Sequence, residues 1–130
     1  MQQAVTRNIA VSVETRFLEN ESDPAENYFV WAYRITIENK GDETVQLLTR
    51  HWQITDAMGR LHEVRGEGVI GEQPVLVPGA AYTYSSGTPL GTPSGFMRGS
   101  YGMQTQDGAR FDIEVPAFSL DSPHEHGNIN

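Results

Sequence analysis

Large apolar or aromatic side chains occupy every second position from 29 to 37 within residues 28–38, whose sequence is YFVWAYRITIE, and smaller or polar side chains stand between them. Five large side chains fall on one face of this stretch if it is extended: Phe29, Trp31, Tyr33, Ile35 and Ile37. Successive side chains of a β-strand point to opposite sides, so a repeat of two is the pattern of a strand with one buried face. The segment therefore predicts a long strand, with Trp31 as the candidate core tryptophan.

The segments on either side repeat this pattern. Ile9, Val11 and Val13 alternate with polar or small residues, whereas residues 20–27 have no apolar anchor and predict an exposed acidic loop. Residues 44–56 also alternate, but their apolar positions change from odd to even numbers after Leu48. A one-residue change of phase indicates a β-bulge at this point.

Glycine and proline divide the rest of the chain into short extended stretches. We expect turns at 39–42 and 57–60, strands at 61–65 and 81–85, and a short edge piece around Val75 and Val77. A long loop is expected from Gly87 to Gly95, followed by a hairpin of residues 96–106 and 109–115 around Asp107-Gly108. No stretch free of glycine and proline carries helical apolar spacing, so no substantial helix is expected.

Seven or eight short-linked antiparallel strands predict an all-β fold, a two-sheet sandwich of the fibronectin type III or immunoglobulin kind. The absence of cysteine favours the fibronectin-like variety, and a small closed barrel is the alternative that alternation alone leaves open. We expect a flexible N-terminus over residues 1–8, one domain over 9–120 and a disordered tail over 121–130. The expected core includes Trp31, Tyr33, Ile35, Trp52, Ile54, Phe111 and Ile113.

Composition excludes several classes of function. The chain has 130 residues, the size of one domain, and 17 acidic against 9 basic residues give a net charge of -8, which argues against general nucleic-acid binding. With no cysteine there is no disulfide, thiolate nucleophile or cysteine-ligated zinc. No apolar run approaches the ~18 residues of a membrane span, and the N-terminus has no apolar signal region. We expect a cytoplasmic protein without a membrane partner.

The glycines at 66, 68 and 71 have the spacing G-x-G-x-x-G of a dinucleotide-binding loop. The segment after Gly71 contains Pro74 and Pro78 and cannot form the helix that such a site needs, so a Rossmann site is rejected. A weaker hypothesis remains, in which backbone N–H groups form an anion-binding nest beside Arg65, with Arg50 or Arg98 as further cations. Its candidate residues are Arg65, Gly66, Gly68, Val69 and Gly71. The competing interpretation is that the glycines only shape a bulged strand.

No other motif predicts chemistry. The four histidines, His51, His62, His124 and His126, occur without a carboxylate cluster of metal-loop spacing, so we expect no metal and no cofactor. The serine segments lack the G-x-S-x-G spacing of a nucleophile, which disfavours an enzyme.

A sandwich offers edges and loops for recognition, and we expect a protein partner. The interface candidates are the arginine and tyrosines of the later loops: Tyr82, Tyr84, Arg98 and Tyr101.

Several motifs together resemble the ApaG (CorD-type) family. They are HWQITD at 51–56, VRGEGVIGEQP at 64–74, LVPG at 76–79, YTYSSGTPL at 82–90, GFMRGSY at 95–101 and FDIEVPAF at 111–118. The similarity extends from about Ile9 to Leu120.

This resemblance implies a fibronectin type III-like sandwich. It implies a single-domain bacterial cytosolic protein linked by name to cobalt and magnesium tolerance. Similar domains in eukaryotes are joined to F-box proteins and to a polymerase delta-interacting protein, which implies protein recognition. The family's glycine motif has been discussed as a pyrophosphate or nucleotide site, and here it falls on Gly66, Gly68 and Gly71.

Overall fold

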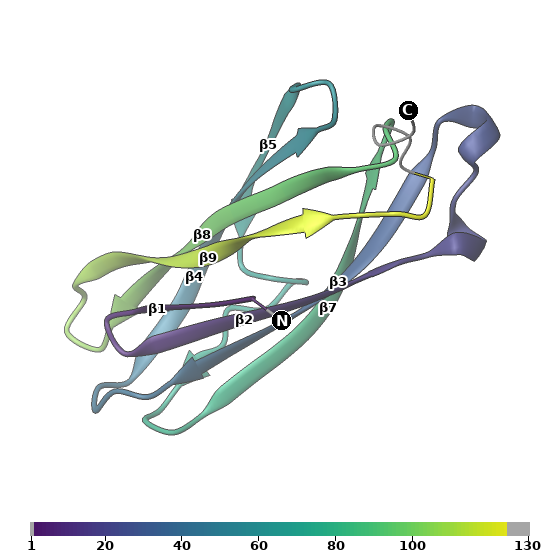
Figure 1. The fold of residues 1–130 in the computed structure, drawn as a ribbon. Helices are drawn as coiled ribbons and strands as arrows, with labels where there is room; N and C mark the ends of the chain where they lie inside the picture. The colour runs from purple at the N-terminus through teal and green to yellow at the C-terminus, as the bar shows by residue number, and fades with distance from the viewer. Residues whose placement is uncertain (1, 125–130) are drawn as a thin grey trace.

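The computed structural model describes residues 2–124, which form two antiparallel sheets packed face to face (Figure 1). The first sheet has the strand order β1-β2-β3-β7 and the second the order β5-β4-β8-β9, with the short β6 paired to the start of β4. The strands are β1 (Gln2–Thr6), β2 (Ile9–Phe17), β3 (Phe29–Asn39), β4 (Val45–Asp56), β5 (Leu61–Glu67), β6 (Val75–Leu76), β7 (Ala81–Leu90), β8 (Gly95–Thr105) and β9 (Arg110–Leu120). This arrangement confirms the sandwich and excludes the closed barrel.

The core lies between the two sheets. All five alternating side chains of β3 are buried, from Phe29 to Ile37, and Trp31 is only 1% exposed. The other expected core residues are buried too, except Phe111, which is partly exposed and packs against the core from its margin. The described helical structure consists of two single 3₁₀ turns: Glu19–Glu21, which overlaps the start of the expected acidic loop, and Pro24–Glu26, which lies within it.

The predicted bulge in β4 is present. The pairing of β4 with β8 shifts by one residue between Leu47 and Thr49. Before the bulge Val45 and Leu47 face the core, and after it Trp52 and Ile54 do, because the extra residue reverses the alternation.

The first residues form a strand where we expected flexibility. β1 pairs with β2 from Gln2 to Thr6, and the intervening Arg7 and Asn8 both have positive φ, the geometry of a tight two-residue hairpin turn. The Arg7 guanidinium lies over the Phe111 ring, 4.2 Å from its centroid, and Thr6 Oγ1 accepts a hydrogen bond from the Glu114 amide of β9. These contacts attach β1 to the second sheet as well as to the first.

The expected loop from Gly87 to Gly95 is shorter than the sequence indicated. β7 continues to Leu90, so that Gly87 and Pro89 lie within it. β7 is the edge strand of its sheet, and a proline is tolerated there because its missing N–H need not pair with a neighbour. The turn itself is confined to residues 91–94.

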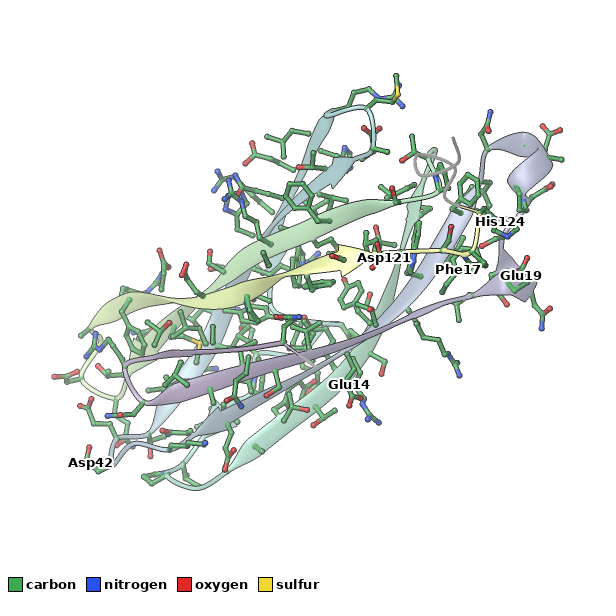
Figure 2. The ribbon with its side chains drawn as sticks, in the orientation of Figure 1. Glu14, Phe17, Glu19, Asp42, Asp121 and His124 are labelled. Atoms are coloured by element: carbon green, nitrogen blue, oxygen red, sulfur yellow. The ribbon has the colours of Figure 1, made fainter. Side chains whose placement is uncertain are left out.

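The chain continues in contact with the sandwich past the expected boundary at residue 120. The indole N–H of Trp31 donates to the Asp121 carbonyl at 2.7 Å, and Ser122 Oγ donates to the Pro93 carbonyl at 2.6 Å. His124 pairs with Glu19 at 3.1 Å and lies beside Phe17, so these residues cover one end of the core (Figure 2). The remainder of the expected tail, residues 125–130, lies outside the described part.

The two long sides of the sandwich differ. On one side β1 and β2 lie beside β9 and close the gap between the sheets. On the other side stand the edge strands β5 and β7, and a cleft opens between them.

Candidate functional site

The glycine motif forms the end of β5 and a tight hairpin beyond it. Val69 and Glu72 exchange two backbone hydrogen bonds of 2.8 and 2.9 Å, and the two residues between them, Ile70 and Gly71, have φ values of 50° and 75°. This is the geometry of a type I′ turn, which favours glycine or asparagine at both central positions. Gly71 suits the turn, whereas the β-branched Ile70 is strained there.

Three backbone amides of this loop donate to protein carbonyls. The Gly68 amide donates to the Leu48 carbonyl at 2.8 Å, and the amides of Val69 and Glu72 donate to each other's carbonyls. Gly68 has a φ of 65°, and a Cβ there would collide with the Glu72 carbonyl oxygen. The second glycine of the motif is therefore explained by the path of the backbone.

The first glycine of the motif makes room for Arg50. Arg50 and Gly66 are cross-strand neighbours in β4 and β5, and a Cβ on Gly66 would stand 2.7 Å from the guanidinium carbon of Arg50. Arg50 Nη1 donates to the carbonyls of Glu67 at 2.9 Å and Gly68 at 3.0 Å. The loop therefore presents carbonyl oxygens to an arginine of its own chain.

Arg50 faces the space between the sheets, next to a group of buried tyrosines. Tyr101 is its cross-strand neighbour in β8, and the hydroxyls of Tyr101 and Tyr84 are 2.5 Å apart. Burial raises the pKa of Tyr84 and of Tyr101, and it raises that of Tyr33 against smaller opposing effects of Ser86 and Arg50. The hydroxyls consequently keep their protons at neutral pH and act as hydrogen-bond donors.

The inter-sheet cleft, as we call the opening between β5 and β7, has a volume of about 640 Å³. Arg50 stands at its inner end with Tyr84 and Val69, and Ile54, His62 and Leu90 line the part farther along the strands. Most of the remaining lining is apolar or aromatic: Tyr33, Trp52, Val64, Ile70, Pro89 and Met97, with Ser86, Gly87 and Thr88 in β7 and Gly91 in the turn after it. Among the described residues, the set that lines the cleft contains no aspartate or glutamate.

The other cations of the phosphate hypothesis lie on the outer face of the second sheet. Arg65 pairs in register with His51, and Arg98 donates to the Gln53 side chain at 3.0 Å. Glu63 accepts hydrogen bonds from His51 and Gln53 there, and these bonds lower the pKa of Glu63. Arg65 and Arg98 thus face away from Arg50, because neighbouring positions along β4 point to opposite sides.

The interface candidates occupy strands, and only one of the four is exposed. Tyr101 is fully enclosed and Tyr84 is buried, Tyr82 is partly buried beside Tyr84, and Arg98 is exposed on the outer face. Sequence reasoning placed Arg50 only as a secondary candidate and did not single out Ile70. A signal for Arg50 was available, since after the bulge it shares the even-numbered phase of Trp52 and Ile54.

A larger hollow of about 790 Å³ lies near the ends of β2 and β9. Its lining includes Glu14 and Arg34, which are both substantially exposed and form an ion pair at 2.6 Å. A solvent-exposed pair of this kind satisfies its own charges and points to no ligand.

Within residues 2–124 no group of three or more histidine, aspartate or glutamate side chains is placed to hold a metal ion, and the expectation of no metal stays a prediction. None of the described segments forms a helix long and apolar enough to cross a membrane.

The fold and the cleft define a fibronectin type III-like β-sandwich domain with one open side. The family model described as the ApaG domain matches residues 19–105. Proteins named "Protein ApaG" from Paramagnetospirillum magneticum and Rhodospirillum centenum are 61% and 62% identical to this chain over 130 residues, and each match covers 100% of both sequences. The chain belongs to the ApaG family.

A solved structure supports the same assignment. The crystal structure of a protein from Bordetella pertussis superposes with a TM-score of 0.86 at 43% sequence identity, covering 90% of this chain and 95% of that one. The fold described above is therefore shared by an experimentally determined relative.

Proposed function

We propose that this domain is a non-enzymatic recognition module that takes an extended segment of a partner protein into the inter-sheet cleft. The observation that carries the proposal is the cleft itself, which lies between two edge strands and is lined mainly by apolar and aromatic side chains. Aromatic residues dominate the energetics of protein interfaces, and an unpaired strand edge is a template for one more strand.

The hydrogen bonds of Val30 identify which backbone groups of β7 are offered to such a segment. The Val30 amide donates to Ser22 Oγ and its carbonyl accepts from the Leu18 amide, so both groups point away from β7. Val30 and Pro89 are therefore a pair without mutual hydrogen bonds, and Pro89 directs its nitrogen to the open edge. Because orientation alternates along a strand, the backbone groups of Gly87 and Ser85 also face the open edge.

A role in cobalt and magnesium tolerance fits this proposal as an indirect effect of binding a partner. The alternative, a pyrophosphate or nucleotide ligand at the glycine motif, has weaker support. The amides of Gly68 and Val69 already donate to carbonyls, and Arg65 and Arg50 diverge. The phosphate hypothesis stays a prediction, which a titration with pyrophosphate would test.

The experiment is selection of binders from a displayed library of random peptides, followed by mapping of one binder through backbone amide shifts. We expect shifts along β7 from Tyr84 to Leu90 and at His62 and Val64 of β5. Ser85→Pro removes one outward N–H from β7 and should weaken binding, whereas Arg98→Ala on the outer face should leave it unchanged. Failure to enrich any peptide, or shifts centred on the outer face, would contradict the proposal.

A further inference from the structure

Arg50 combines three features that no other side chain of the cleft shares: a permanent charge, a fixed position and a place among tyrosine hydroxyls. We propose that the Arg50 guanidinium is a carboxylate-binding site and that the cleft takes an extended segment carrying an acidic side chain. This inference rests on the proposed function, because it identifies the chemistry of the segment that the cleft accepts.

The charge distribution supports an anionic ligand. The chain has a net charge of -8, yet the described residues that line the cleft include no carboxylate, and Arg50 is the one arginine or lysine among them. An arginine in a partly enclosed, largely apolar site attracts an opposite charge more strongly than a surface arginine does, because the surroundings screen it less.

The position of the guanidinium suits a carboxylate. Its Nη1 atom is held by the carbonyls of Glu67 and Gly68, and its other nitrogens donate to no described residue. A guanidinium has five N–H donors in a planar fork that matches the two oxygens of a carboxylate. Fixing one nitrogen in advance reduces the conformational entropy lost when the ligand binds.

The tyrosines supply a further donor. In the Tyr84–Tyr101 hydroxyl pair one hydroxyl donates to the other, so a single hydroxyl proton remains for another acceptor. Arg50 lies close enough to lower the pKa of both tyrosines against the larger effect of burial. With Tyr101 as the donor of this pair, the free proton belongs to Tyr84, which lines the cleft together with Arg50, so one cation and one hydroxyl donor face a ligand there.

The amount of positive charge distinguishes the ligand class. A pyrophosphate group carries two or more negative charges and is usually held by several cations or by converging amides. Here one guanidinium stands between apolar walls formed by side chains such as Trp52, Ile54 and Val69. A group with one negative charge, flanked by apolar side chains, matches this site.

The test is a double-mutant cycle on a peptide obtained from the library selection. The peptide is compared with its Glu→Gln (or Asp→Asn) form, on the wild-type domain and on Arg50→Gln. We expect the peptide change to weaken binding roughly 10- to 100-fold on the wild-type domain, the effect of a charge-assisted hydrogen bond, and to have little effect on Arg50→Gln. Equal loss on both domains would overturn the inference and leave the proposed function standing.

Three further measurements keep the inference testable if Arg50→Gln does not fold. Phenylacetate and phenylacetamide, titrated into the wild-type domain, differ only in the charged group. We expect shifts of the Arg50 side-chain N–H signals with the acid alone, and equal shifts with both would contradict the inference. The selected peptide is also compared as free acid and as C-terminal amide. Loss of binding on amidation alone would show that Arg50 binds the peptide's C-terminal carboxylate and would overturn the proposal of an acidic side chain. Tighter binding of pyrophosphate than of phenylacetate would overturn the proposal that the ligand is a carboxylate.

Discussion

The guanidinium carbon of Arg50 lies 2.7 Å from the point that a Cβ on Gly66 would occupy. The first glycine of the G-x-G-x-x-G motif therefore leaves room for the side chain of its cross-strand neighbour, an arginine 16 positions earlier in the chain. This relationship gives the motif a role in positioning Arg50.

Substituting the first two glycines of the motif should separate positioning from folding. Gly66→Ala should change the free energy of unfolding by less than about 1 kcal/mol, because Gly66 has ordinary backbone geometry and the guanidinium can move aside. Gly68→Ala should cost about 2 kcal/mol or more, since its φ is 65° and its Cβ meets backbone. Denaturant unfolding measures both.

Peptide binding separates the two substitutions further. Gly66→Ala should lower the affinity for a peptide with an acidic side chain but not for its Gln form, because the displaced guanidinium interacts only with the carboxylate. A Gly66→Ala domain as unstable as Gly68→Ala would contradict the assigned role.

Replacing Ile70 should stabilise the domain. Ile70 has a φ of 50° and is 60% exposed at the cleft, an unfavourable place for a β-branched apolar residue. Ile70→Asn suits the type I′ turn and should raise the free energy of unfolding by about 1 kcal/mol. Thermal and denaturant unfolding measure the gain, and a loss of stability would show that the side chain packs usefully.

Truncating Trp31 should be severely destabilising. The ring is 1% exposed, packs edge-to-face on Phe17 with centroids 5.4 Å apart, and donates its indole N–H to Asp121. We expect Trp31→Ala to cost about 3–5 kcal/mol in denaturant melts. Arg34→Ala, on the exposed face of the same strand, is the matched control and should cost less than about 1 kcal/mol.

Alkaline pH should destabilise the domain through its buried tyrosines. The folded-state pKa values of Tyr33, Tyr84 and Tyr101 lie above their ordinary value of 10.0, so the unfolded chain releases these protons first. Their contribution to stability is complete below pH 10 and is lost as the pH rises above that value toward the folded-state pKa.

Tyrosinate absorbance measures this effect. The folded domain should reach only part of the full absorbance at a pH where the unfolded chain has reached all of it. Arg50→Gln should raise the three pKa values further, because it removes a positive charge that favours the phenolate. Identical titration curves for the folded and unfolded chains would contradict the burial of these hydroxyls.

Strand phase was predictable wherever one face is buried and the alternation is regular. Residues 29–37 and the bulge at Leu48 followed from polarity alone, because burial of every second side chain is what the core requires. β1 was missed since its side chains are mostly exposed and its turn uses Arg7 and Asn8 without a glycine. The end of β7 was missed because Gly87 and Pro89 indicate a loop unless the strand is known to be an edge.

The candidate site was harder to predict for a different reason. Arg50 and Gly66 meet only through the register of β4 with β5, and Tyr84 meets Tyr101 only through the packing of one sheet on the other. Periodicity assigns a face to each residue but does not say which residues of two strands are neighbours. The glycine motif suggested a ligand loop because its spacing carries no information on the hydrogen bonds its amides already make.

Pro89 also affects the association of this protein with further copies of itself. An open strand edge invites a second copy to pair along its whole length, the first step of edge-to-edge aggregation. On β7 Pro89 lacks the N–H that would face the open edge, so the ladder of hydrogen bonds to a second copy would be broken at residue 89. Together with the mutual repulsion of chains that each carry a charge of -8, this interruption disfavours long ladders between copies, while leaving Ser85 and Gly87 accessible to a short segment of another protein.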